Sequence, residues 1–276
     1  MTNEVTVFDE KWASQAKQYA STERTVSGFI THRAGQFKAG EMEFPELCAI
    51  ILESVPENAY YGASFDPNKL TPPKCFAFGE PGSGDESEMA PHPAMQADPD
   101  WFEPQSEDCK SCQWNQFGSA EKGKGKACKN GRRLVVIPAG TFSKRKGSRD
   151  LDLDLYVGDD VPANEAREHL ANADAYVLKV PPTSIKEWRA FVHLINNEYH
   201  RPPQGVVTRI WTEPMTNGGH KLCFEPLALL PDDTYPVMEQ RNAEARATIV
   251  QPYSGPDKEE KPQQQPRGLK RLGQSA

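Results

Sequence analysis

The 276-residue sequence contains little that suits a membrane. Hydrophobic residues make up only 37% of the chain, and no run of about 18 apolar residues is present to form a spanning helix. The N-terminus, MTNEVTVFDEKW, lacks the basic start and the apolar stretch of a signal peptide. We therefore expect a cytoplasmic protein with a modest core and no membrane partner.

Motifs of common enzymes are also missing. The histidines form no HxxxH pair, and there is no G-x-S-x-G. The run from Gly118 to Lys124 resembles a phosphate-binding loop, but Gly125 stands where a Ser or Thr must hold Mg²⁺. We therefore predict that the protein is not an enzyme.

One alternative is a metal-dependent nuclease or recombination enzyme. Asp150, Asp152 and Asp154 alternate with leucines, so their carboxylates share one face of a predicted strand. Such a face would bind Mg²⁺ in a nuclease. A solvated strand face is the simpler interpretation, because no matching Glu, Lys or His constellation lies near in the sequence.

Cysteine is concentrated around a long irregular segment, 79–131. Six cysteines in a cytosolic chain are more typical of thiols or metal ligands than of disulfides. Four of them follow the pattern C-x33-C-x2-C-x15-C: Cys75, Cys109, Cys112 and Cys128. Two thiolates two residues apart can point at one ion, and four complete a tetrahedron. We predict a structural zinc site that orders a segment with no core of its own.

The cysteine spacing leaves alternatives open. His92 is the rival to Cys75 as the fourth ligand, and an iron–sulfur cluster is the rival to zinc. A redox-active CxxC pair is the rival to a metal site, although no βαβ pattern surrounds it. Cys48 and Cys223 lie in apolar runs and are expected in the core.

The net charge of −7 conceals a strong local pattern. Residues 80–108 contain nine acidic residues and no Lys or Arg, whereas residues 110–149 contain eleven bases and one acid, Glu121. A concentrated basic segment can bind a polyanion even in an acidic protein, because phosphate contact depends on the local field. Mutual neutralisation of two solvated loops is the alternative.

Aromatic residues are interleaved with these bases, which is typical of single-strand nucleic-acid binding. The residues predicted to stack on bases are Trp114, Phe117, Phe142 and Trp211. The residues predicted to neutralise phosphates are Lys122, Lys124, Lys126, Lys129, Arg132, Arg133, Lys144, Arg145, Lys146 and Arg149. If the strand that starts near Arg132 belongs to a barrel, both basic clusters would line one groove.

The periodicity predicts a β-rich α+β fold. Strands are expected at 28–32, 36–44, 47–55, 72–79, 132–140, 150–157, 175–181, 205–214 and 221–229, and helices at 162–172, 184–199 and 235–249. We expect an OB-like barrel core with a metal-stabilised insertion and flanking helices. The predicted domains are an N-terminal helical arm (1–24), a core (25–250) with a four-cysteine metal loop inserted at about 75–131, and a disordered tail (251–276).

Several segments resemble a family of tailed-phage proteins of similar length. They are ENAYY (57–61), PPKCFAFGEPG, CKSCQWNQFGSAEKGKGKACKNGRRLVVIP, and VLKVPPTSIKEW with VVTRIWTEP and KLCFEP after it. The layout is similar to that of T-even phage single-stranded DNA-binding proteins, in which an OB-fold carries an inserted zinc subdomain, and to the zinc element of eukaryotic replication protein A. The T-even proteins use one histidine and three cysteines and end in an acidic tail, whereas this chain ends RGLKRLGQSA.

Together the residues and the resemblance predict a bacteriophage protein that binds single-stranded nucleic acid, DNA in particular, without sequence preference. It would act in replication or recombination in the host cytoplasm, with phage replication or recombination proteins as partners. The second alternative is a zinc-containing virion or regulatory protein whose loop binds another protein.

Overall fold

The computed structural model describes residues 28–33, 35–62, 71–144, 151–158, 160–216 and 218–255. The predicted helical arm, 1–24, lies outside the described residues. The predicted disordered tail starts at 251, but Gln251 to Gly255 are described and Tyr253 packs against the core of the insertion. The rest of that prediction, from 256 onward, lies outside the described residues.

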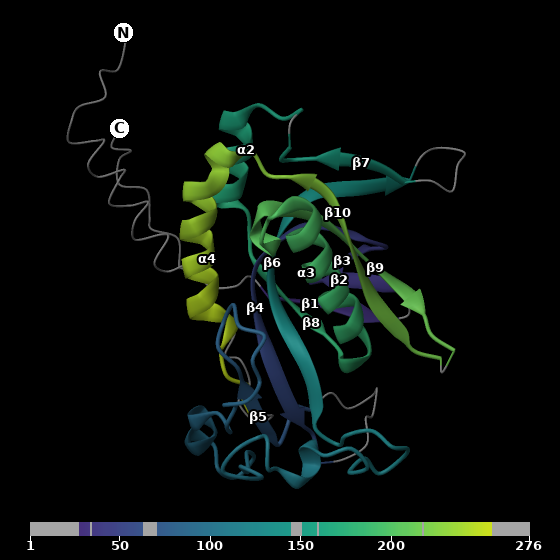
Figure 1. Cartoon of the computed structure of the whole chain (residues 1–276), viewed down its shortest axis with the longest axis vertical. Helices are drawn as coiled ribbons and strands as arrows, with labels where there is room; N and C mark the ends of the chain where they lie inside the picture. The colour runs from purple at the N-terminus through teal and green to yellow at the C-terminus, as the bar shows by residue number, and fades with distance from the viewer. Residues whose placement is uncertain are drawn as a thin grey trace, which may run out of the picture.

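A single mixed sheet forms the centre of the protein (Figure 1). Its strands are β1 (Phe29–Arg33), β2 (Gln36–Ala39), β3 (Met42–Phe44), β4 (Leu47–Tyr60), β5 (Cys75–Phe78), β6 (Lys129–Lys144), β7 (Leu151–Leu155), β8 (Tyr176–Val180), β9 (Val206–Pro214) and β10 (His220–Leu229). The order is β10-β9-β4-β6-β8-β1-β2-β3, while β5 pairs with β4 and β7 pairs with β6. Strands β1 and β8 are parallel, and the other pairs are antiparallel.

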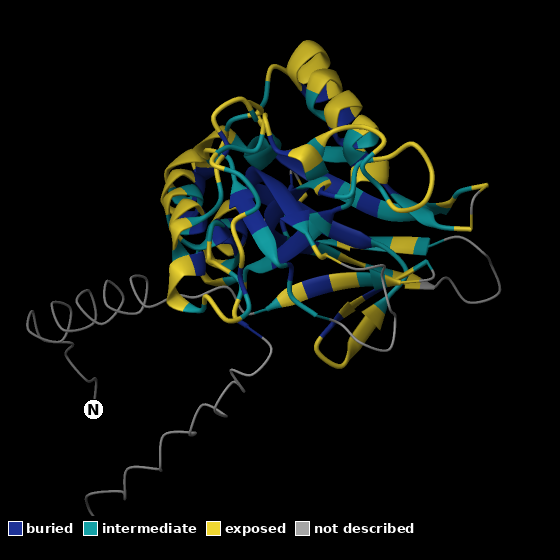
Figure 2. Cartoon of the chain, turned by 90° about the horizontal axis from the view of Figure 1, so that it is seen from below, coloured by how far each residue is buried: buried dark blue, intermediate teal, exposed yellow. Residues whose placement is uncertain are grey.

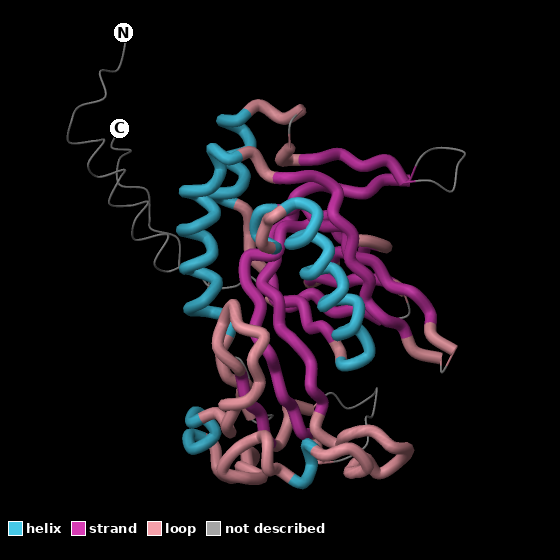
Figure 3. Tube along the Cα trace, viewed as in Figure 1, coloured by secondary structure: helices cyan, strands magenta, loops and turns pink. Residues whose placement is uncertain are grey.

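Helices cover both faces of the sheet, as Figure 3 shows. They are α2 (Ala163–Asn172), α3 (Ile185–Tyr199) and α4 (Tyr235–Ile249), with short 3₁₀ turns at Pro93–Ala97, Gln113–Asn115, Pro182–Ser184, Pro203–Gly205 and Asp232–Thr234. Helix α3 packs on one face through Trp188, Phe191 and Ile195. Helices α2 and α4 pack on the other, so β4 and β6 are buried between the layers (Figure 2). The predicted β-rich α+β class is confirmed.

The sheet is open, and it curves around α3. One apolar cluster contains Phe37 of β2 and Leu222 of β10, from opposite ends of the strand order, together with Trp188 of α3. The two ends approach at the β1–β2 turn, where a Cβ added to Gly35 would lie 3.7 Å from Thr212 Oγ1. Among the described strands, however, no ladder joins the two ends, so the expected closed OB-like barrel is not present. A helix fills the space that opposing strands fill in a barrel.

The insertion between β5 and β6 consists mostly of loops at the far end of β4 (Figure 3). Met95 and Phe102 of the insertion form a small apolar cluster with Phe76 of β5, against which Trp101 and Tyr253 pack. The segment therefore shares its apolar cluster with β5 and with the C-terminal segment. Its aromatic residues are too widely spaced in the sequence to give a periodic signal.

The helices of the described residues were also compared with the length of a membrane span. None of them is both long enough and apolar enough to cross a bilayer.

Candidate metal centre and nucleic-acid interface

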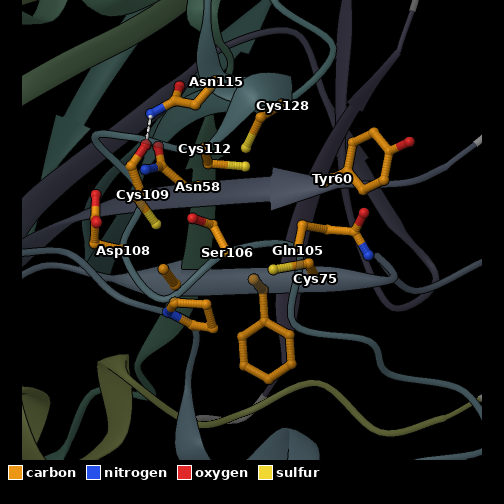
Figure 4. A pocket seen from close by; sticks show the side chains of 13 residues that line it. Asn58, Tyr60, Cys75, Gln105, Ser106, Asp108, Cys109, Cys112, Asn115 and Cys128 are labelled. Atoms are coloured by element: carbon orange, nitrogen blue, oxygen red, sulfur yellow. Dashed lines mark hydrogen bonds between the residues drawn. The ribbon is translucent and has the colours of Figure 1, made fainter.

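The four predicted cysteine ligands line one small cavity in the insertion (Figure 4). Cys75 begins β5, Cys109 and Cys112 lie in the loops, and Cys128 directly precedes β6. The cavity has a volume of about 20 Å³, which is the space of a single water-sized particle. All four side chains are free thiols. The fold thus brings together residues that are up to 53 positions apart, from 75 to 128.

Backbone hydrogen bonds position these thiols. Pairing of Tyr60 with Cys75 fixes the start of β5 next to the end of β4. The Cys109 amide donates to the Met89 carbonyl at 2.8 Å, and the Cys128 amide donates to the Trp114 carbonyl at 2.8 Å. The sulfur positions therefore depend on sheet pairing as well as on the loops.

The electrostatics of the cavity suit a bound cation. Burial, with a smaller contribution from the neighbouring thiols, raises the pKa of Cys109 to about 11 and that of Cys128 to about 12. Burial also raises the pKa of Cys75, against a hydrogen bond from the Gln105 backbone that favours its thiolate. The Asn58 side chain provides such a bond to Cys109. A divalent ion would offset the repulsion between thiolates and lower these pKa values.

The chemistry of the donor set fits zinc, because four thiolates are the ligands of a closed structural zinc site. Within the described part of the chain, no three His, Cys, Asp or Glu side chains are close enough together to form a coordination sphere. The thiols therefore share a cavity rather than a formed ligand shell. Zinc stays a prediction that the donor set and the cavity size support.

His92 has another role. Its Nδ1 accepts a hydrogen bond from the Ala94 amide at 3.2 Å, and its ring stacks on Phe76 with 5.3 Å between centroids. Cys75, not His92, lines the cavity. The structure thus favours Cys75 as the fourth donor.

Phe117 is the most exposed large hydrophobic residue of the described chain, with 82% of its surface accessible. The Lys126 ammonium lies 5.3 Å from the centre of its ring and donates to Asn115 at 3.2 Å. Lys122 and Lys124 are exposed on the adjoining turn. The loop thus presents an aromatic face and several ammonium groups together.

Backbone hydrogen bonds close this loop at its base. The Gly118 amide donates to the carbonyls of Lys124 and Gly125 at 3.1 and 3.0 Å. Gly118 and Gly123 have φ of 89° and 81°, values that L-residues with a side chain rarely adopt. Lys129 is also exposed, and its ammonium donates to the Lys126 carbonyl at 3.3 Å. The loop therefore has a defined shape.

Trp114 is partly used by the protein itself. Its ring stacks on Tyr60 with 5.0 Å between centroids and 17° between planes, and its Nε1 donates to Gln105 Oε1 at 2.9 Å. One face of the Trp114 ring is therefore already covered by Tyr60. Tyr60, which the sequence analysis did not select, belongs to this site because it ends β4 beside the cysteines.

Arg133 does not contact phosphates as predicted. Its side chain is 2% exposed, and its Nε donates to Glu57 at 2.7 Å. Its Nη1 donates to the carbonyls of Gln251 and Ile249 at 2.7 and 3.3 Å. The guanidinium therefore ties the C-terminal segment to the sheet.

Arg132 is also buried, so the prediction that it contacts phosphates was wrong for the same reason. Its Nη1 donates to Ser54 Oγ at 2.9 Å and to the Ser83 carbonyl at 3.3 Å, and its guanidinium lies 5.9 Å from the Trp188 ring. Both arginines lie on β6, a central strand that is covered on both faces. The apolar run that follows them in the sequence was the signal that could have indicated their burial.

Glu57 is the centre of a buried charged cluster. Burial alone would raise its pKa, but Lys179 and Arg133, together with hydrogen bonds from Tyr253 and Arg133, hold the pKa below its ordinary value. The Tyr253 hydroxyl donates to Glu57 at 2.6 Å. The Arg133 guanidinium also lies over the rings of Phe78 and Tyr253, at 4.2 and 4.8 Å.

Phe142 and Trp211 lie on either side of another arginine. The Arg209 guanidinium is 5.8 Å from the Phe142 ring and 5.0 Å from the Trp211 ring, and it makes a two-pronged ion pair with Glu46 at 2.5 and 2.9 Å. Both rings are partly buried, and both lie near the same guanidinium. The structure brings them together, but not with Trp114 and Phe117.

Lys129 starts the 16-residue strand β6 and Lys144 ends it, so up to about 50 Å of extended chain separates the backbones of these two residues. The prediction that both basic clusters line one groove stays a prediction. The Lys144 side chain and the residues Arg145, Lys146 and Arg149 lie outside the described part of the chain.

The acidic strand face offers little to a metal. Asp152 and Asp154 are exposed on one side of β7, whereas Asp150 lies outside the described residues. No third carboxylate, histidine or cysteine joins them in the described structure. The nuclease alternative gains no support from this geometry.

Comparison with known proteins adds no relative to this picture. No family model, curated protein or solved structure matches the chain. The resemblance to tailed-phage proteins therefore stays a prediction, and the site alone supports the functional argument.

Proposed function

We propose that this protein binds single-stranded nucleic acid, DNA in particular, through the cysteine-held loop. The observation that carries the proposal is the 82% exposure of Phe117 beside Lys126, on a loop with two more exposed lysines. The exposed ring leaves its π-face accessible to a partner. A nucleic-acid base offers it a π-face, and the adjacent phosphates offer the lysines negative charge.

On this proposal the ion acts only as a structural element. Held by Cys75, Cys109, Cys112 and Cys128, it would fix the two ends of the lysine loop. The curved open sheet would serve as the rigid support that an OB barrel provides in the proteins that the chain resembles. A place in phage replication or recombination would follow from non-specific single-strand binding.

Changing Lys122, Lys124 and Lys126 together to Ala should weaken binding and flatten its salt dependence, because each phosphate contact releases counterions. For three lost contacts, the slope of log K against log salt should fall by about 2. The measurement is fluorescence anisotropy of labelled oligo-dT at several salt concentrations. Phe117→Ala should cost about 1–3 kcal/mol of binding free energy with an unchanged slope.

The matched control removes three charges outside the insertion: Lys38, Arg167 and Arg201, each changed to Ala. Their side chains are between 35% and 49% accessible, and each is paired with a carboxylate on the surface. This control should leave affinity and slope close to those of the native protein. Equal effects of both triple variants would show that only net charge matters. No binding of any oligonucleotide at low salt would favour the protein-interaction alternative instead.

A further inference from the structure

A second exposed aromatic site lies on another part of the sheet. Phe29 of β1 is 52% exposed, and Tyr61, which follows β4, is 37% exposed. The Lys179 ammonium of β8 lies 5.7 Å from the Phe29 ring and 4.4 Å from the Tyr253 ring. The Tyr61 hydroxyl interacts electrostatically with that of Tyr253. The residues Phe29, Tyr61, Lys179 and Tyr253 come from four segments that are distant in the sequence. Lys179 and Tyr253 connect the two exposed rings.

The charges of this site do not cancel. The charged groups around Lys179 are Glu57 and Arg133, and its hydrogen-bond partner is the neutral Tyr253 hydroxyl. One carboxylate thus faces two cations, and Arg133 makes the direct ion pair with it at 2.7 Å. Within the described residues, no carboxylate lies within ion-pair distance of the Lys179 ammonium. An anion from outside would supply the missing charge.

We propose that Phe29, Tyr61 and Lys179 form a second subsite for single-stranded nucleic acid. Lys179 binds a backbone phosphate, and the rings of Phe29 and Tyr61 stack on the neighbouring bases. The combination of one excess positive charge with flanking exposed rings matches the repeating phosphate and base of a single strand. This inference rests on the proposed function, and it extends the binding surface beyond the cysteine-held loop.

The end of β4 connects the two subsites. Tyr60 stacks on Trp114 on the side of the cysteine cavity, whereas the next residue, Tyr61, contacts Tyr253. Successive side chains of a strand point to opposite faces, so the two subsites meet at this strand end. A strand bound to Phe117 continues around the end of β4 to Phe29.

Photocrosslinking tests the path directly. Oligo-dT containing 4-thiothymidine is bound to the full-length protein, irradiated and digested, and the crosslinked peptides are identified by mass spectrometry. We expect crosslinks at Phe29 or Tyr61 as well as in the segment 110–129. Crosslinks confined to 110–129 would overturn the second subsite and leave the proposed function intact, whereas no binding at all would reject both.

Affinity measurements provide an independent check. Phe29→Ala should weaken oligo-dT binding about tenfold, as expected for one lost stacking contact. Lys179→Gln should lower the salt slope by about 0.7, the value for one phosphate on a single strand. Phe29 is exposed, so its variant keeps the test valid if Lys179→Gln disturbs the fold. Native affinity in Phe29→Ala, with weakened binding in the lysine-loop variant, would refute this subsite alone.

Discussion

Changing Cys112 and Cys128 together to Ser should abolish metal binding and unfold the insertion. Both side chains are only 8% exposed, and they lie on opposite sides of the lysine loop. Two hydroxyls cannot replace two thiolates as zinc ligands, so the site loses half of its donors. Because the free energy of metal binding is also folding free energy, the free energy of unfolding should fall by several kcal/mol.

The measurement is metal content by plasma emission spectrometry, together with thermal unfolding. We expect about one zinc per native chain, near zero in the double variant, and faster proteolysis within 79–131. Chelation of the native protein should have the same effect. If the proposed ion holds the loop that carries Phe117, the loss of oligo-dT binding should accompany the loss of metal.

Cys48 and Cys223 provide the matched control. Both are buried thiols of the sheet, outside the cavity. Changing both to Ala removes two cysteines and some packing, but it should leave the metal content unchanged. If the double variant with Cys112→Ser and Cys128→Ser kept the metal content of the native protein, the proposed metal centre would be rejected. Bound iron together with visible absorbance would show that the site holds an iron–sulfur cluster instead of zinc.

Arg133→Met should lower the free energy of unfolding by about 3–5 kcal/mol, the usual effect of removing one partner of a buried ion pair. The change leaves Glu57 with Lys179 alone and releases the carbonyls of Ile249 and Gln251. Chemical denaturation measures it. The double variant Glu57→Gln with Arg133→Met should lose less than the sum of the two single variants, because the pair acts as a unit.

The pH dependence gives a second readout of this cluster. Folding lowers the pKa of Glu57, so its contribution to stability is complete above the ordinary glutamate pKa of 4.5 and is lost as the pH falls through the folded value. Removing Arg133 should shrink this acid-dependent loss. An Arg133→Met protein with native stability and native acid sensitivity would show that the ion pair is unimportant.

Local sequence signals predicted the regular elements well. The helix expected at 235–249 has those bounds in α4, and the strands expected at 205–214 and 221–229 are present as the antiparallel pair β9 and β10. The cysteine spacing selected four residues that do share one cavity. These features depend on residues close in the chain or on a spacing that chemistry restricts.

Ser184 shows the limit of such signals. It begins a pattern, Ser184-Ile-Lys-Glu187, that is typical of a helix-capping box. In the structure its hydroxyl accepts a hydrogen bond from the Leu222 amide at 2.8 Å, and no side chain caps α3. A partner from β10, 38 residues away, competes successfully for the same oxygen atom.

The amino-acid sequence was enough to predict which segments form strands and helices. It also showed where the cysteines and the basic residues are concentrated. Periodicity, turn residues and ligand spacing are local, so they can be read along the chain. Only the tertiary structure decided that the sheet curves openly around α3, that Arg132 and Arg133 are buried, and that Phe29 and Tyr253 lie beside Lys179. Those outcomes depend on strand order and on packing between distant segments, which no local pattern encodes.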